Sequence, residues 1–98
     1  MVEVVRSATF DRWLNKLKDR RAAARVVIRI NRLAVGNAGD VKPVGHGVSE
    51  LRIDYGPGYR LYYQQHGPII VVLLAGGDKS TQDADINRAI EIAKEWKP

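Results

Sequence analysis

The sequence contains no cysteine and only two histidines in 98 residues. Without cysteine there is no disulfide framework, no thiolate zinc site and no cysteine nucleophile, and a small disulfide-free chain is typical of the reducing cytosol. The two histidines, His46 and His66, stand beside glycine in predicted turns, and two separate turn histidines are too few for a metal site. We therefore expect no metal ion, no cofactor and no direct chemical role for either histidine.

Long apolar segments are also missing. The longest one, residues 69–75, has seven residues, whereas a membrane-spanning helix needs about 20. The first residues lack a basic lead followed by a hydrophobic stretch, so no secretory signal is expected. The sequence therefore predicts a cytoplasmic protein without a membrane partner. The length fits one domain, 1–98, and the hydrophobic content of 45% argues against disorder.

Positive charge is in excess and is unevenly placed along the chain. The formal net charge is +5, with 16 basic and 11 acidic residues. Residues 1–33 hold nine basic and three acidic side chains, whereas residues 34–75 hold three of each. This balance fits an anionic partner such as RNA, and it means that the cations in the middle of the chain are placed singly.

The spacing of apolar residues predicts an α+β domain, because helical periods come first and strand periods follow. The predicted elements, in chain order, are a strand at 2–5, a helix capped by Ser7 and running to about Leu17, a helix with an apolar face from Ala23 to Ala34 that includes Val27, a loop at 37–47, strands at 50–55, 59–64 and 69–75, and a last helix behind a capping box at 80–83. Gly76 and Gly77 are expected to end the third of these strands. The expected architecture is a small antiparallel β-meander with an N-terminal αα-hairpin and a C-terminal helix.

Two arginines are predicted to face each other on this sheet. Aligning the apolar residues of the strands at 50–55 and 59–64 places Arg52 directly opposite Arg60. Like charges in that position are unfavourable by up to about 1 kcal/mol, and a bound phosphate would relieve them, since the arginine fork grips phosphate in two places. The alternative is that both are solvated strand residues, with Glu50 and Asp54 as their partners. In either case Arg60, as a sheet-surface residue, is expected to contribute little to packing.

The end of the same sheet offers further polar side chains. The third strand is expected to bring Ala75 near Tyr59, and with it Lys79 and Ser80 at the start of the last helix, where anions are favoured. A lone loop lysine is more often only a surface residue. Tyr62 falls on the arginine face, where its phenol can stack on a base or donate a proton, and simple surface exposure is equally open.

A basic stripe is predicted on the second helix. Its four members are spaced four, four and three residues apart: Arg21, Arg25, Arg29 and Arg32. Such a stripe is usually the wet face of an amphipathic helix. The alternatives are that it steers phosphate, with Arg25, Arg29, Arg32 and Ser80 as candidate RNA-binding residues, or that it meets an acidic protein partner.

Five segments carry recognisable motifs: 50–53, 56–63 with Gly-Tyr-Arg, 73–80 with Gly-Gly-Asp-Lys-Ser, the first helix, and 29–40. Together they resemble the RelE/ParE toxin superfamily, and within it the HigB-like addiction module killer branch. The resemblance covers nearly the whole chain. It implies a small antiparallel sheet carrying a helical hairpin, and a toxin of a type II toxin–antitoxin pair. In the ribonuclease branch such toxins cleave messenger RNA in the ribosome, and a cognate antitoxin, expected to carry a helix-turn-helix domain, blocks them.

The resemblance also implies roles for particular residues. Arg60 of the Gly-Tyr-Arg motif would stabilise the scissile phosphate, with Arg52 on the preceding strand and Lys79 after the last strand beside it. Attack by a ribose 2′-hydroxyl on the neighbouring phosphate needs a proton acceptor, charge stabilisation and a proton donor. Family members carry a tyrosine or histidine just after the last strand, where this chain has Thr81, Gln82, Asp83 and Asp85. The substitutes available for the proton donor are Tyr62, Glu50 and Asp78.

Two other functions stay open at this point. ParE-like members of the superfamily inhibit DNA gyrase through protein contact without catalysis, in which case the helical hairpin would matter more than the two strand arginines. A plain nucleic-acid-binding module would need only the basic stripe.

Overall fold

A computed structural model describes residues 2–96 and confirms the α+β class, with a helical hairpin followed by a meander and a last helix. The elements are β1 (Glu3–Arg6), α1 (Ala8–Lys16), α2 (Arg20–Ala34), β2 (Val41–Gly45), β3 (Val48–Ile53), β4 (Tyr59–His66), β5 (Ile70–Asp78), the 3₁₀ turn η1 (Lys79–Thr81) and α3 (Gln82–Glu95). Within residues 2–96 no helix has both the length and the apolar character needed to cross a membrane.

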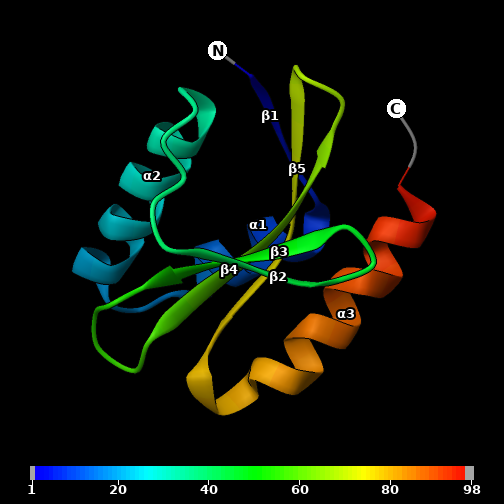
Figure 1. Cartoon of the computed structure of the whole chain (residues 1–98). Coiled ribbons are helices and arrows are strands. Elements are labelled where there is room, and N and C mark those ends of the chain that lie inside the picture. The colour runs from blue at the N-terminus through cyan, green and yellow to red at the C-terminus, as the bar shows by residue number, and fades with distance from the viewer. Residues whose placement is uncertain (1, 97–98) are drawn as a thin grey trace.

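The five strands form one sheet with helices on both of its faces. The strand order is β1-β5-β4-β3-β2; β1 runs parallel to β5 and the other neighbours are antiparallel. Figure 1 shows α2 on one side of the sheet and α3 on the other. The chain therefore has three layers, and both faces of the central strands are covered.

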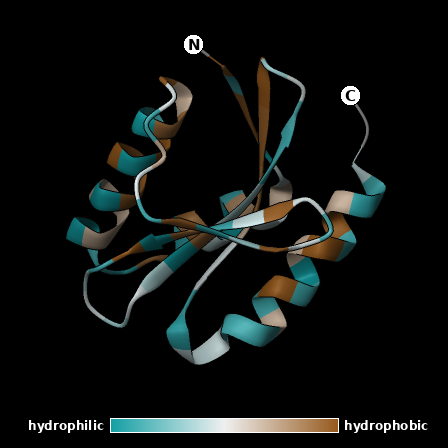
Figure 2. Cartoon of the chain, in the orientation of Figure 1, coloured by the Kyte–Doolittle hydropathy of each residue, from teal (hydrophilic) through white to brown (hydrophobic). Residues whose placement is uncertain are grey.

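Each face of the sheet has its own apolar core, because successive strand residues point to opposite faces. The core under α1 and α2 consists of Phe10, Val26, Ile30, Leu33, Leu51, Ile53, Leu61, Tyr63, Val71 and Leu73. The core under α3 consists of Val48, Tyr62, Val72, Leu74, Ala75 and Ala89. β5 contributes to both, and Figure 2 shows hydrophobic residues along it. The apolar run at 69–75 is therefore a central strand, as predicted.

Three parts of the predicted sheet are wrong. The sheet is mixed and not antiparallel throughout, because β1 pairs parallel with β5. The segment predicted as a loop contains the edge strand β2, which pairs with β3 although it carries Pro43 and a register shift between Pro43 and Gly45; proline is tolerated there because edge strands leave one side unpaired. Gly76 and Gly77 do not end β5. They continue it to Asp78, so Asp78 and not Ala75 lies opposite Tyr59.

The predicted helix caps are correct at one end of the chain and wrong at the other. The Ser7 hydroxyl accepts from the Phe10 N–H at 3.0 Å and begins α1, as predicted. The capping box at 80–83 does not form, because α3 begins at Gln82 without a side-chain cap. The apolar face of α2 is also narrower than predicted. Val27, which was expected to lie on it, is exposed, as is its neighbour Ile28.

Candidate anion-binding site

The predicted strand register is correct. Arg52 pairs with Arg60, and Glu50 pairs with Tyr62, across β3 and β4. The neighbours of these residues along each strand belong to the core under α1 and α2. Both arginines therefore lie on the other face of the sheet, which α3 covers only in part.

A hollow of about 410 Å³ opens at this end of the sheet, and we name it the arginine pocket. Its lining residues are Asp40, Arg52, Ile53, Asp54, Gly58, Tyr59, Arg60 and Lys79. Three cations and two carboxylates thus surround one space, and its size lies within the range of small-molecule sites, about 300–1,000 Å³. The prediction that Arg52, Arg60 and Lys79 come together is confirmed.

Arg60 is held firmly at the wall of this pocket. Its side chain is only 12% exposed, so it is not the solvated residue of the alternative interpretation. Its Nη1 donates to the Gly58 carbonyl at 2.8 Å, and its Nε lies 3.6 Å from Glu50 Oε1, an ion pair without a hydrogen bond. The guanidinium is therefore fixed in orientation before any anion arrives, which favours charge stabilisation.

Glu50 is the buried counter-charge of Arg60. Its side chain is 1% exposed, and its Oε2 accepts from the Tyr62 hydroxyl at 3.2 Å and from Gln82 Nε2 at 2.8 Å. Gln82 is the first residue of α3, so the start of this helix closes over the carboxylate. A buried carboxylate needs such partners, since removal from water is costly for a charge.

Tyr62 does not lie on an open surface. It is fully buried under α3, and it does not line the arginine pocket. Burial first, and then the charge of Glu50 and the hydrogen bond to it, raise the pKa of the Tyr62 hydroxyl far above its usual value. The expectations of base stacking and of surface exposure are both wrong for this residue, and its hydroxyl serves Glu50.

Arg52 has a different partner and more freedom. Its Nη2 lies 3.0 Å from Asp40 Oδ1, and the pair is exposed, with 39% of the Arg52 side chain in solvent. The backbone N–H of Arg52 also donates to the Asp40 carbonyl. The partner is thus Asp40 and not Asp54, the acid that alternation along the strand suggested. An exposed ion pair is weak, so an incoming anion can compete with Asp40 for Arg52.

Of the two predicted site residues that follow β5, Lys79 and Ser80, only Lys79 reaches the arginine pocket. Lys79 is exposed and lines the arginine pocket, whereas Ser80 does not line it. The Ser80 N–H and hydroxyl both donate to Asp78 Oδ1, at 2.8 and 2.5 Å, and the hydroxyl bond is the largest cause of the lowered pKa of Asp78. Asp78 is therefore a carboxylate that shapes the turn, which does not suit it to donate a proton.

The basic stripe of α2 is divided in its roles. Arg29 Nη1 donates to the Arg52 carbonyl at 2.9 Å and its Nη2 to the Ala38 carbonyl at 3.0 Å, so Arg29 joins α2 to β3 and to the loop before β2. Arg25 lies over the Tyr55 ring, 4.5 Å from its centroid. Arg21 is exposed and does not line the arginine pocket.

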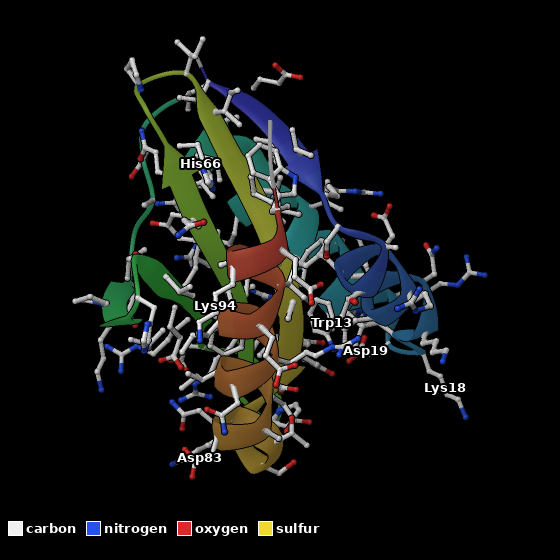
Figure 3. All side chains as sticks on the ribbon, turned by 90° about the vertical axis from the view of Figure 1, so that its right-hand side faces the viewer. Trp13, Lys18, Asp19, His66, Asp83 and Lys94 are labelled. Carbon is white, nitrogen blue, oxygen red and sulfur yellow. The ribbon has the colours of Figure 1, made fainter. Side chains whose placement is uncertain are left out.

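The histidines are remote from the pocket. His46 lies in the β2–β3 turn and His66 ends β4, which places both at the opposite end of the strands from Arg60. Figure 3 shows His66 and Asp83 toward opposite ends of α3. His66 Nε2 lies 2.7 Å from Gln64 Oε1, and its ring lies 4.5 Å from that of Trp96. Over residues 2–96 no group of three or more histidine or acidic side chains could hold a metal ion.

An uncharacterized protein of Haemophilus influenzae is 51% identical to this chain over 94 residues, which are 96% of this chain and 95% of that protein. The chain belongs to the family of this Haemophilus protein. No family model and no solved structure matches the chain. The function of this chain therefore has to be argued from the geometry of its arginine pocket.

Sequence reasoning did not place Asp40, Asp54 or Tyr59 at the arginine pocket, although all three line it. Asp40 lies in a segment without periodicity, so nothing in the sequence placed it beside Arg52. Tyr59 was counted only as an inward-facing strand residue, although it packs at the core edge and also lines the pocket. Burial first, and then the nearby Asp19 and Asp78, raise the pKa of its hydroxyl.

Competition between Asp40 and an anion predicts the effect of Asp40→Asn. This change keeps the shape of the side chain but removes its charge, so inorganic phosphate should bind the arginine pocket about two- to fivefold more tightly, the size of an exposed ion pair. Phosphate titration followed by the Arg52 and Arg60 amide NMR shifts measures this. Glu91→Gln, on the outer face of α3, removes the same net charge and should change nothing; an equal gain in both variants would show that only net charge matters.

Proposed function

We propose that this chain is a cytoplasmic toxin of a type II toxin–antitoxin pair, of the RelE/ParE kind, that cleaves messenger RNA on the ribosome and so blocks translation. The observation that carries the proposal is the arginine pocket, in which Arg52, Arg60 and Lys79 converge from three separate segments on one hollow. Such convergence fits a phosphodiester, whose charge increases in the transition state. Neither the fold nor the Haemophilus relative assigns this function, which rests on the pocket and on the motifs.

The pocket supplies what RNA cleavage by an internal hydroxyl requires. The ribose 2′-oxygen loses its proton and attacks the adjacent phosphorus, the bond to the 5′-oxygen breaks, and that oxygen takes up a proton; the products are a cyclic phosphate and a free 5′-hydroxyl. Arg60 and Arg52 hold the non-bridging oxygens, and Lys79 neutralises the added charge. Fixed donors lower the barrier because they need no reorientation during the reaction.

Two lining residues of the pocket carry groups that can exchange protons. The phenol of Tyr59 is protonated at neutral pH, as tyrosine normally is, and can donate a proton to the departing 5′-oxygen, which is a much stronger base. Asp54 is an exposed carboxylate of the same lining, which suits an acceptor for the 2′-hydroxyl proton. Tyr62 and Glu50 are excluded from these roles because both are buried beneath α3.

Expression of the chain from a tightly repressed promoter tests the proposal. We expect growth arrest and new 5′ ends within translated messages, and we expect Arg52→Ala to lose both. The matched control is Arg12→Ala, which removes an exposed arginine of α1 outside the pocket and should stay toxic. Induction of the DNA-damage response with intact messages would instead support inhibition of DNA gyrase. Normal growth would support a plain nucleic-acid-binding module.

The partners proposed from the resemblance have a separate readout in the same strain. A cognate antitoxin with a helix-turn-helix domain should be encoded beside this chain and should copurify with it. Its coexpression should restore growth and should abolish the new 5′ ends within translated messages.

A further inference from the structure

We infer that a second hollow, between α2 and the end of β3, is a phosphate subsite that binds the phosphate next to the scissile one on the same RNA strand. This inference rests on the proposed function and extends its site. The hollow has a volume of about 300 Å³, and its lining residues are Arg25, Ile28, Arg29, Arg32, Ile53 and Asp54. We name it the α2 pocket.

The α2 pocket adjoins the arginine pocket. Ile53 and Asp54, at the end of β3, line both hollows. Arg29 also links them, since it lines the α2 pocket and donates to the main-chain carbonyl of Arg52, whose side chain lines the arginine pocket. A strand bound in one pocket therefore passes directly to the other around the end of β3, which fits consecutive phosphates of one chain.

The charge of the α2 pocket favours an anion. Three arginines face a single carboxylate, that of Asp54. Burial first, and then the charge of Arg32, lower the pKa of Arg29, as expected where like charges lie close together. A phosphate placed among them relieves this repulsion, and arginine forks bind phosphate oxygens in pairs.

Two of the three arginines of the α2 pocket are also held in place. Arg29 is fixed by two main-chain carbonyls, and Arg25 is held over the Tyr55 ring. Fixed donors lose little conformational entropy when they bind a ligand. The solvated face of an amphipathic helix has no need of such anchoring.

Ile28 adds an apolar surface to the α2 pocket. The residue is 56% exposed although it lines the pocket, so it can contact the sugar of a bound strand beside the arginines. A positively charged groove that follows the backbone is typical of single-strand sites. An acidic protein segment is the competing occupant, and the experiment separates the two.

The test measures binding of a short RNA with one phosphate neutralised at a time as a methylphosphonate, with 2′-deoxyribose at the cleavage position to prevent reaction. For the unaltered protein, neutralising the scissile phosphate and one adjoining phosphate should each weaken binding about tenfold. In Arg25→Gln/Arg32→Gln, which retains Arg29, neutralising the adjoining phosphate should weaken binding by clearly less than tenfold, whereas neutralising the scissile phosphate should still weaken it about tenfold. Because one phosphate contact is lost, the salt dependence of log K should become shallower by about 0.7.

The matched control is Arg21→Gln, which removes a cation of the same α2 stripe that lines neither pocket. It should behave as the unaltered protein. If the double variant weakens binding equally at every phosphate position, or if it loses only the binding of an acidic peptide, the subsite is refuted. The proposed function fails separately, if the unaltered protein does not cleave the all-ribose RNA or if Arg60→Lys cleaves as fast as the parent.

Discussion

Replacing Arg60 by alanine is expected to abolish RNA cleavage and also to destabilise the fold. Loss of a fixed donor to the transition state costs about 10²–10³ in rate. The same change leaves the buried Glu50 carboxylate without its counter-charge, and removing one partner of a buried pair costs about 3–5 kcal/mol. Single-turnover cleavage of a short RNA measures the first effect, and urea unfolding measures the second.

A double variant separates the two roles of Arg60. In Arg60→Ala/Glu50→Gln both charges are absent, and the glutamine still accepts from Tyr62 and Gln82, so most of the lost stability should return while cleavage stays absent. Arg12→Ala, an exposed arginine outside the pocket, should match the parent in both measurements. Cleavage by the double variant near the parental rate would refute the phosphate role, and equal stability of the single and double variants would refute the ion-pair role.

Replacing Gly76 by alanine is expected to destabilise the fold, and more so than the same change at Gly77, the other glycine of β5. An added Cβ would clash with the Trp13 ring of α1, and this ring packs against the core, so it cannot move aside without losing those contacts. Overpacking of this kind costs about 1–3 kcal/mol and occasionally more, and each kcal/mol lowers the melting temperature by about 4–8 °C for a chain of this size. Thermal unfolding followed by circular dichroism measures it.

Gly77→Ala is the matched comparison, because it adds the same group on the other face of β5. There the new Cβ meets the Asp85 carboxylate, which also accepts from Thr81. A short side chain near solvent can rotate away at the loss of one hydrogen bond, so the fall in melting temperature should be smaller than for Gly76→Ala. Equal falls in the two variants would contradict the close packing of α1 on Gly76.

Gly76 and Gly77 show why the sequence wrongly predicted the end of β5. A Gly-Gly pair after an apolar run predicts the end of a strand, because glycine is unfavourable in strand interiors. In this fold Gly76 and Gly77 continue β5 because α1 approaches one face and α3 the other, closer than a Cβ would allow. The same approach brings Asp78 beside Tyr59 and so places Lys79 at the pocket.

The amino-acid sequence by itself determined the class of fold and the pairing of Arg52 with Arg60. Both depend on local periodicity, since a one-residue slip would move every apolar side chain of β3 and β4 to the wrong face. The sequence also placed the helical hairpin and the last helix, because apolar stripes at helical spacing are read over short windows.

Only the tertiary structure decided which polar side chains are buried and which partner each one has. Alternation along β3 and β4 identifies two faces but cannot say that both are covered, because α3 arrives from a distant part of the chain. That packing buries Glu50 beneath Gln82, withdraws Tyr62 from the surface and makes Arg60 a held cation. The irregular segment before β2 likewise places Asp40 beside Arg52, for which no periodic pattern exists.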